Sequence, residues 1–158
     1  MRIGEDEGKG IPVVVVDDAG DEHPIVLPLG ARPLPEVVDG AEIRAGDPIT
    51  DGPFDPKELM EIKGPRETQM YLVEEVQRVY RDQGVSIHDK HIELIVRQMT
   101  RRIAVSEPGS TDFLPGERVD AKRFRDTNRA MVESGERPSE GRPEIMGITK
   151  ASLATESW

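Results

Sequence analysis

The chain has 158 residues, with 31 acidic against 21 basic side chains and a formal net charge of −10, which argues against a free-standing DNA-binding protein. It contains no cysteine, which excludes disulfide scaffolds, cysteine-ligated zinc, iron–sulfur clusters and thiol nucleophiles. It has no apolar run of about 18 to 20 residues and no N-terminal signal pattern, so we expect a soluble, cytoplasmic chain with no membrane partner.

Residues 1–63 are expected to form an acidic, β-rich module. Two β-branched runs, at 11–16 and 24–29, flank an Asp- and Gly-rich turn, which is typical of a β-hairpin. Glycines then recur at positions 40, 46 and 52 with isoleucines midway between them, a pattern that favours short strands joined by tight turns. Most of the negative charge lies here, because residues 1–64 hold 6 basic and 15 acidic side chains.

Residues 64–104 are expected to form a two-helix unit. Gly64 and Pro65 mark the start of the first helix, Gly84 gives it a left-handed end, and Ser86 is a candidate cap for the second helix. In each helix, apolar residues spaced three and four apart predict one buried face. These residues are Leu72, Val73, Val76, Val79 and Tyr80 in the first helix, and Ile92, Ile95, Val96, Met99 and Ile103 in the second.

Residues 105–158 are expected to form a mixed tail of strand, loop and short helix that partly returns to the β-rich module. The segment 113–119 repeats the glycine pattern of the first module and predicts a second strand pair. Residues 127–134 favour a short helix, and residues 135–143 a polar connector. The whole chain is therefore predicted to be α+β, a small barrel-sandwich-like β module with a helical pair and this tail.

Neither catalysis nor metal binding is predicted from the residues. His88 and His91 lack a third ligand at a defined spacing and favour a helix start with solvated imidazoles. The acidic turn at 17–22 lacks the ligand spacing of an EF-hand and indicates a solvated hairpin tip. Nucleotide-binding, metalloprotease and serine-hydrolase motifs are absent from the sequence, so no catalytic residue is assigned.

Four basic residues on and after the second predicted helix form a candidate interface. They are Lys90, Arg97, Arg101 and Arg102. Arginines one turn apart suit phosphate or the carboxylates of a partner, whereas charge on a helix is more often a solvated face. Both alternatives stay open at the level of the sequence.

Three long strings are less generic: YLVEEVQRVYRDQGV at 71–85, IHDKHIELIVRQM at 87–99 and GITKASLATES at 147–157. Together they closely resemble the C-terminal part of the β′ subunit of bacterial DNA-directed RNA polymerase, most closely its actinobacterial versions. The string STDFLPG at 110–116 resembles the linking segment of that family. The match is strong over residues 64–158 and looser over residues 1–63.

The resemblance implies a place in a large nucleotidyltransferase. The chain would comprise the distal jaw with its barrel-sandwich module, the helical pair, and the start of the switch segment at the base of the clamp, near the downstream DNA. The aspartate string that binds catalytic Mg²⁺ in the family is absent here, and so are its cysteine-ligated zinc sites. We therefore expect an inactive fragment that needs no cofactor of its own, with magnesium and zinc held elsewhere in the subunit.

The resemblance also implies binding residues and partners. Lys150, flanked by Thr149 and Ser152, lies where the switch segment of the family approaches the DNA backbone. An ammonium group and hydroxyls are suitable phosphate ligands that carry no base information. The implied partners are the β, α, ω and σ subunits of the polymerase and downstream DNA, in the nucleoid region of the cytoplasm.

A second hypothesis treats the chain as an independent, non-catalytic interaction module whose acidic β-domain docks a basic protein partner. It depends on the strong negative charge of residues 1–64. The two hypotheses differ at Gly147–Trp158, because an independent module should pack this segment whereas a fragment should leave it disordered.

Overall fold

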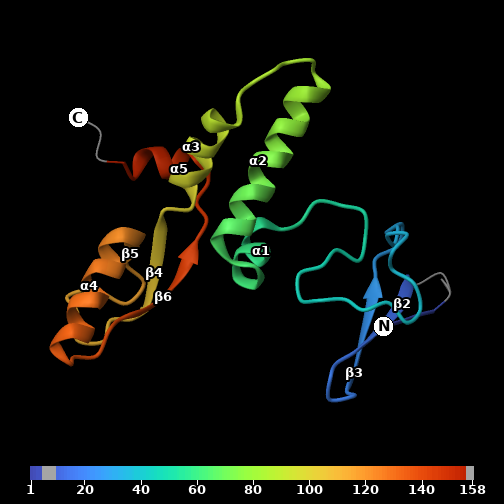
Figure 1. Cartoon of the computed structure of the whole chain (residues 1–158), viewed down its shortest axis with the longest axis horizontal. Coiled ribbons are helices and arrows are strands. Elements are labelled where there is room, and N and C mark those ends of the chain that lie inside the picture. Colours follow the sequence, from blue (N-terminus) through green and yellow to red (C-terminus); the bar gives the residue numbers. More distant parts are fainter. Residues whose placement is uncertain (5–9, 156–158) are drawn as a thin grey trace. The chain divides into compact units, whose positions relative to one another are not determined.

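The computed structural model describes residues 1–4 and 10–155 (Figure 1). The chain divides into two compact units, Met1–Phe54 (unit 1) and Asp55–Trp158 (unit 2). Helices and strands both occur, so the predicted α+β class is confirmed. The last residues of the predicted switch segment, from Glu156 to Trp158, lie outside the described residues. The functional division of the chain at residues 63 and 104 stays a prediction.

Unit 1 contains the predicted hairpin. Strands β2 (Ile11–Val16) and β3 (Glu22–Leu27) pair antiparallel, and β1 (Arg2–Ile3) adds to the free edge of β2. The order is β1-β2-β3, so the sheet formed by the described residues is open and not a closed barrel. In the turn, the Asp17 carboxylate accepts hydrogen bonds from the amides of Ala19 and Asp21 at 3.0 and 2.9 Å. The interpretation of this acidic turn as an exposed hairpin tip is confirmed.

Residues 33–52 of unit 1, which contain the glycine repeat, do not form the short strands predicted for the repeat. Gly40 and Gly46 do make turns with positive φ, but among the described residues of this segment the pairing is limited to one isolated bridge between Pro33 and Thr50. The predicted short strands are therefore wrong. Prolines supply no amide donor for a ladder, and they recur at positions 33, 35 and 48. The segment still contributes Val37 to the buried residues of this unit.

Unit 2 begins with a helix that the sequence analysis did not predict. Helix α1 (Pro56–Ile62) starts at Asp55, whose carboxylate accepts a hydrogen bond from the Lys57 amide at 2.8 Å, with Pro56 in the first turn. Its buried residues are Leu59 and Met60, and it packs against α2. Residues 56–62 of the predicted β-rich module are therefore helical.

The predicted helical pair is present as α2 (Gly64–Asp82) and α3 (Asp89–Met99). Gly84 follows α2 with φ of +71°, as predicted. The predicted cap at Ser86 is wrong, because α3 begins after His88, whose Nδ1 accepts from the Lys90 amide at 3.2 Å. The Gln77 side-chain amide donates to the Ile87 carbonyl and to the Asp89 carboxylate, both at 2.6 Å, and so holds the connection extended up to His88.

The buried faces of the two helices are only partly those predicted. Ile92 and Val96 are buried as expected, but Ile95 is 46% exposed, Val76 37% and Val79 55%. Helix α3 contacts both α2 and α5, and the residue of α2 that bonds to α3 is the buried, polar Gln77. Spacing alone marks these apolar positions equally, so it could not identify the ones that the neighbouring helices cover. Ile103 lies outside α3, in strand β4.

The rest of unit 2 is a second three-stranded sheet with two helices. The antiparallel order is β5-β4-β6, from β5 (Arg118–Asp120), β4 (Arg102–Glu107) and β6 (Glu140–Glu144). Of the segment 113–119, only residues 118–119 are in a strand, and their partner β4 comes from outside the segment, so the predicted second strand pair is only partly right. The predicted connector is wrong over residues 140–143. A Cβ on Gly141 would lie 2.7 Å from Cγ2 of Ile103. The backbone of β6 at Gly141 therefore lies very close to β4, and the strand lacks the alternating apolar residues that would have indicated it in the sequence.

Helix α4 (Ala121–Ser134) extends the predicted short helix toward the N-terminus, and α5 (Ile148–Leu153) forms near the end of the chain. Helix α5 packs against α3 and buries Ala151 (Figure 1). The disorder that the fragment hypothesis expects after Gly147 is therefore wrong for the described residues. The folded state of residues 147–155 therefore does not decide between the two hypotheses, and membership of a protein family has to decide instead.

Candidate nucleic-acid interface

The second sheet has one apolar and one polar face, because side chains alternate along each strand. The apolar face carries Val105 and Val119, which pack with Phe113 and with Phe124 of α4 in the buried core. The register pairs Ala104 with Arg118, and Arg102 with both Asp120 and Glu144. These paired residues share the other face, so the polar side chains of the sheet lie on the side away from the Phe124 core.

A groove of about 760 Å³ lies beside this polar face, and we call it the α1–α5 groove. Its walls come from α1, from β5 and β6, from the segment 145–147 and from α5. Three basic and two acidic side chains line it: Lys57, Arg118 and Lys150, with Glu61 and Glu144. A groove with a small excess of positive charge stands out in a chain whose net charge is −10.

Arg118 and Glu144 form a two-point ion pair in this groove. The guanidinium donates to the two carboxylate oxygens at 2.5 and 2.9 Å, the fork geometry that makes such pairs strong. Hydrogen bonds from Arg118 lower the pKa of Glu144 and outweigh the effect of burial, and the charges of Arg118, Lys150 and Lys57 lower it further. The same pair raises the pKa of Arg118. The charge of Glu144 is therefore largely matched by Arg118.

The three residues predicted to bind DNA lie on α5 but do not form one cluster. Thr149 and Lys150 are exposed and line the α1–α5 groove. Ser152 lines a different groove, between α3 and α5, and its hydroxyl donates to the Ile148 carbonyl at 2.9 Å. The structure thus brings Thr149 and Lys150 together and separates Ser152 from them. Contact of these residues with DNA stays a prediction.

The four basic residues of the candidate interface do not form one surface either. Lys90 and Arg97 are exposed and lie two turns apart on one side of α3. Arg101 pairs with Asp120, the residue that caps α4. Arg102 donates to the Ala154 carbonyl at 2.8 Å and so links β4 to the end of α5. Two of the four are therefore engaged in contacts that hold unit 2 together.

Two residues of the α1–α5 groove, Lys57 and Arg118, were missed by the sequence analysis. The signal for Lys57 was available, since an aspartate followed by a proline is a typical helix start. Nothing in the sequence indicates that Arg118 reaches across the sheet to Glu144, because 26 residues separate them.

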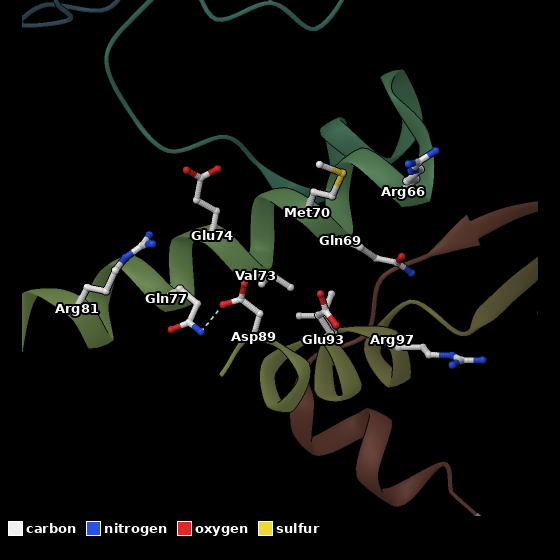
Figure 2. Close-up of a pocket in the computed structure, with 11 residues that line it drawn as sticks. Arg66, Gln69, Met70, Val73, Glu74, Gln77, Arg81, Asp89, Glu93 and Arg97 are labelled. Atoms are coloured by element: carbon white, nitrogen blue, oxygen red, sulfur yellow. Dashed lines mark hydrogen bonds between the residues drawn. The ribbon is translucent and has the colours of Figure 1, made fainter. Parts of the chain in front are cut away.

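A second groove of about 620 Å³ lies between α2 and α3, and Figure 2 shows the side chains that line it. Its charged residues are Arg66, Arg81 and Arg97 with Glu74, Asp89 and Glu93. The hydrogen bond from Gln77 to Asp89 crosses it. With equal numbers of basic and acidic groups, this groove suits a polyanion less well than the α1–α5 groove does.

Metal ligation and membrane crossing find no support in the part of the chain that the structure describes. Within it, no three His, Asp or Glu side chains are grouped so that they could hold a metal ion. Within the same residues, no helix has the length and apolar character that a bilayer span needs.

Residues 7–156 match the family model described as RNA polymerase Rpb1, domain 5. The chain belongs to this family. The sequence is also similar to proteins named DNA-directed RNA polymerase subunit beta′, which confirms the resemblance noted from the residues. It is 54% identical to that of Kocuria rhizophila over 154 residues, 52% to that of Bifidobacterium adolescentis over 154 residues, and 51% to that of a Parafrankia species over 158 residues.

These alignments cover 98%, 98% and 100% of this chain, but the chain spans only 12% of the length of each of these three relatives. The Rpb1 domain 5 match covers most of both units and all of the candidate residues described above.

Proposed function

We propose that this chain serves, as a segment of a β′ subunit, in template-directed RNA synthesis by forming part of the wall of the downstream DNA channel. The observation that carries the proposal is the position of Lys150 and Thr149 on the α1–α5 groove, in a chain that matches the Rpb1 domain 5 family. The helices and sheet of unit 2 would join the jaw to the clamp.

The chemistry of the groove supports contact with a phosphate backbone. Lys150 supplies an ammonium group and Thr149 a hydroxyl, both exposed, and these groups bind phosphate oxygens without reading the base sequence. The carboxylate of Glu144, which would otherwise repel a phosphate, is held by Arg118. The groove therefore presents cations to DNA in spite of the acidic composition of the whole chain.

In this proposal, the segment contacts other polymerase subunits and binds no cofactor of its own. The β, α, ω and σ subunits would surround it in the assembled enzyme, in the nucleoid region of the cytoplasm. Catalytic magnesium and structural zinc would be held by other parts of the subunit. Unit 1, whose residues 1–54 include 12 acidic and 4 basic side chains, would face solvent or protein and not DNA.

The test is the salt dependence of DNA binding by a polymerase assembled with a β′ subunit that carries this sequence. Lys150→Ala should lower the slope of log K against log salt by about 0.9, the effect of one lost phosphate contact. Lys122→Ala is the matched control, because Lys122 is exposed on α4 and outside the groove. An unchanged slope for Lys150→Ala, equal to that of the control, contradicts the proposal.

The interaction-module hypothesis has less support. Its motivating charge lies in unit 1, yet the family match runs through both units from residue 7 to residue 156. An independent module would bind a basic peptide as an isolated chain, with an affinity that falls when acidic residues of unit 1 are neutralised.

A further inference from the structure

Lys57 has a defined position in the wall of the α1–α5 groove. It is the second residue of α1, and its amide is fixed by the Asp55 carboxylate at 2.8 Å. The cap sets where α1 begins and therefore where the Lys57 side chain leaves the backbone. Lys57 is exposed and lines the same groove as Lys150.

The two lysines approach one carboxylate from two different helices. Lys57 of α1 and Lys150 of α5 both influence Glu144 by their charge. Neither forms an ion pair with another residue in the ranges 1–4 and 10–155. Because Arg118 occupies both oxygens of Glu144, the two ammonium groups are left with weak local counter-charge. Glu61 is the other carboxylate in the described lining.

This arrangement suits a ligand with several closely spaced negative charges. Duplex DNA carries one charge per roughly 1.7 Å of its axis. A groove of this size that binds one phosphate group of the duplex therefore lies close to several others. Two cations on separate elements can then each neutralise a different phosphate.

We propose that Lys57 is a second DNA-phosphate contact, which acts together with Lys150 so that both lysines bind the backbone of the same downstream duplex. The inference rests on the proposed function and adds a residue from α1, more than 90 positions before Lys150, to the same interface. Arg118 supports the site by holding Glu144, and it need not touch DNA itself.

The competing occupant is an acidic segment of another part of the polymerase. Carboxylates are matched best by the planar fork of arginine, whereas the ammonium of lysine is a point charge that suits phosphates in many orientations. In the described lining of this groove, both cations without an ion pair are lysines, and Thr149 lines the same groove. These features favour DNA over a protein segment.

The experiment compares Lys57→Ala, Lys150→Ala and the double variant in the assembled polymerase, with Lys122→Ala as control. Binding to a downstream duplex is measured from 50 to 200 mM salt. Each single variant should lower the slope by about 0.9 and the double variant by about 1.8. Raising the salt fourfold lowers the affinity of every enzyme form by some factor. For each single variant, this factor should be about 3.5-fold smaller than for the unmodified enzyme.

The outcomes separate the two proposals. If Lys150→Ala lowers the slope and Lys57→Ala does not, the inference about Lys57 fails while the proposed function stands. If neither changes the slope, the proposed function fails as well. If Lys57→Ala leaves the slope unchanged but weakens assembly of the polymerase, the groove binds a protein carboxylate and the inference is overturned.

Discussion

Arg118 on β5 donates two hydrogen bonds to the carboxylate of Glu144 on β6, so that the ion pair spans the central strand β4. The register puts both residues on the same face of the sheet, where Arg118 pairs with Ala104 and Glu144 with Arg102. Glu144 lies three residues before the Gly147 cap of α5. The pair therefore fixes the edge of the sheet from which Thr149 and Lys150 extend.

Glu144→Gln should tighten DNA binding by the assembled polymerase. The change removes a negative charge from the groove and releases the Arg118 guanidinium, so affinity at low salt should rise several-fold and the salt slope should become steeper. Glu140→Gln is the matched control, because Glu140 is on the same strand but outside the groove. Equal or weaker binding by Glu144→Gln would show that this groove does not face DNA.

Asp120→Ala should destabilise the chain more than Arg101→Ala. The Asp120 carboxylate caps α4 by accepting from the amides of Lys122 and Arg123 at 2.9 and 3.4 Å, and loss of such a cap costs about 1 kcal/mol. Arg101→Ala removes only an exposed ion pair, worth about 0 to 1 kcal/mol. Urea unfolding of the chain measures both. The reverse order would mean that the ion pair with Arg101, not the cap, is what stabilises this helix start.

Val96→Asp should unfold the chain far more readily than Ile95→Asp does. Val96 is 3% exposed and Ile95 is 46% exposed, and an unpaired charge is costly only where water cannot reach it. Thermal melting of the two variants provides the comparison. Equal losses in melting temperature would show that Ile95 is as buried as Val96, as its spacing in the sequence predicts.

Acid should destabilise unit 2 through Asp120 and Glu144. Hydrogen bonds from Arg118 hold the pKa of Glu144 below its ordinary value; burial raises the pKa of Asp120, but bonds from Arg101 and two amides outweigh it. A lowered folded pKa gives stability that is full above the unfolded pKa of about 4 and is lost as the pH falls through the folded pKa.

Urea midpoints measured from pH 6 to pH 2.5 test this dependence. The double variant with Asp120→Asn and Glu144→Gln should show a smaller decline below about pH 4 than the unmodified chain. A decline of the same size in both would place the acid-sensitive groups elsewhere in the chain.

The sequence predicted the elements that depend mainly on residues close together in the chain, such as the hairpin and the end of α2. The hairpin at 11–27 follows from β-branched runs around a turn, and the end of α2 follows from Gly84. Strand β6 has no such signal, because its residues Glu140–Glu144 are polar and its place depends on pairing with β4. The buried Gln77 was hidden for the same reason, since its partners at Ile87 and Asp89 are set by the fold.

The candidate site was predictable only in part. Lys150 and Thr149 came from the family resemblance, and the structure adds the groove that they share with Lys57. Ser152 lies only two positions after Lys150 but lines the groove between α3 and α5 instead, because helix positions two apart do not face each other. Arg101 and Arg102 were grouped by charge, whereas their partners Asp120 and Ala154 separate them.

Contact of the α1–α5 groove with downstream DNA is tested by a photo-cross-linking residue at position 149 in the assembled polymerase. Val132 on α4, which is 63% exposed, is the control position. We expect position 149 to cross-link to the backbone of the downstream duplex and position 132 not to do so. Cross-linking of position 149 to another polymerase subunit, with none to DNA, would contradict this contact.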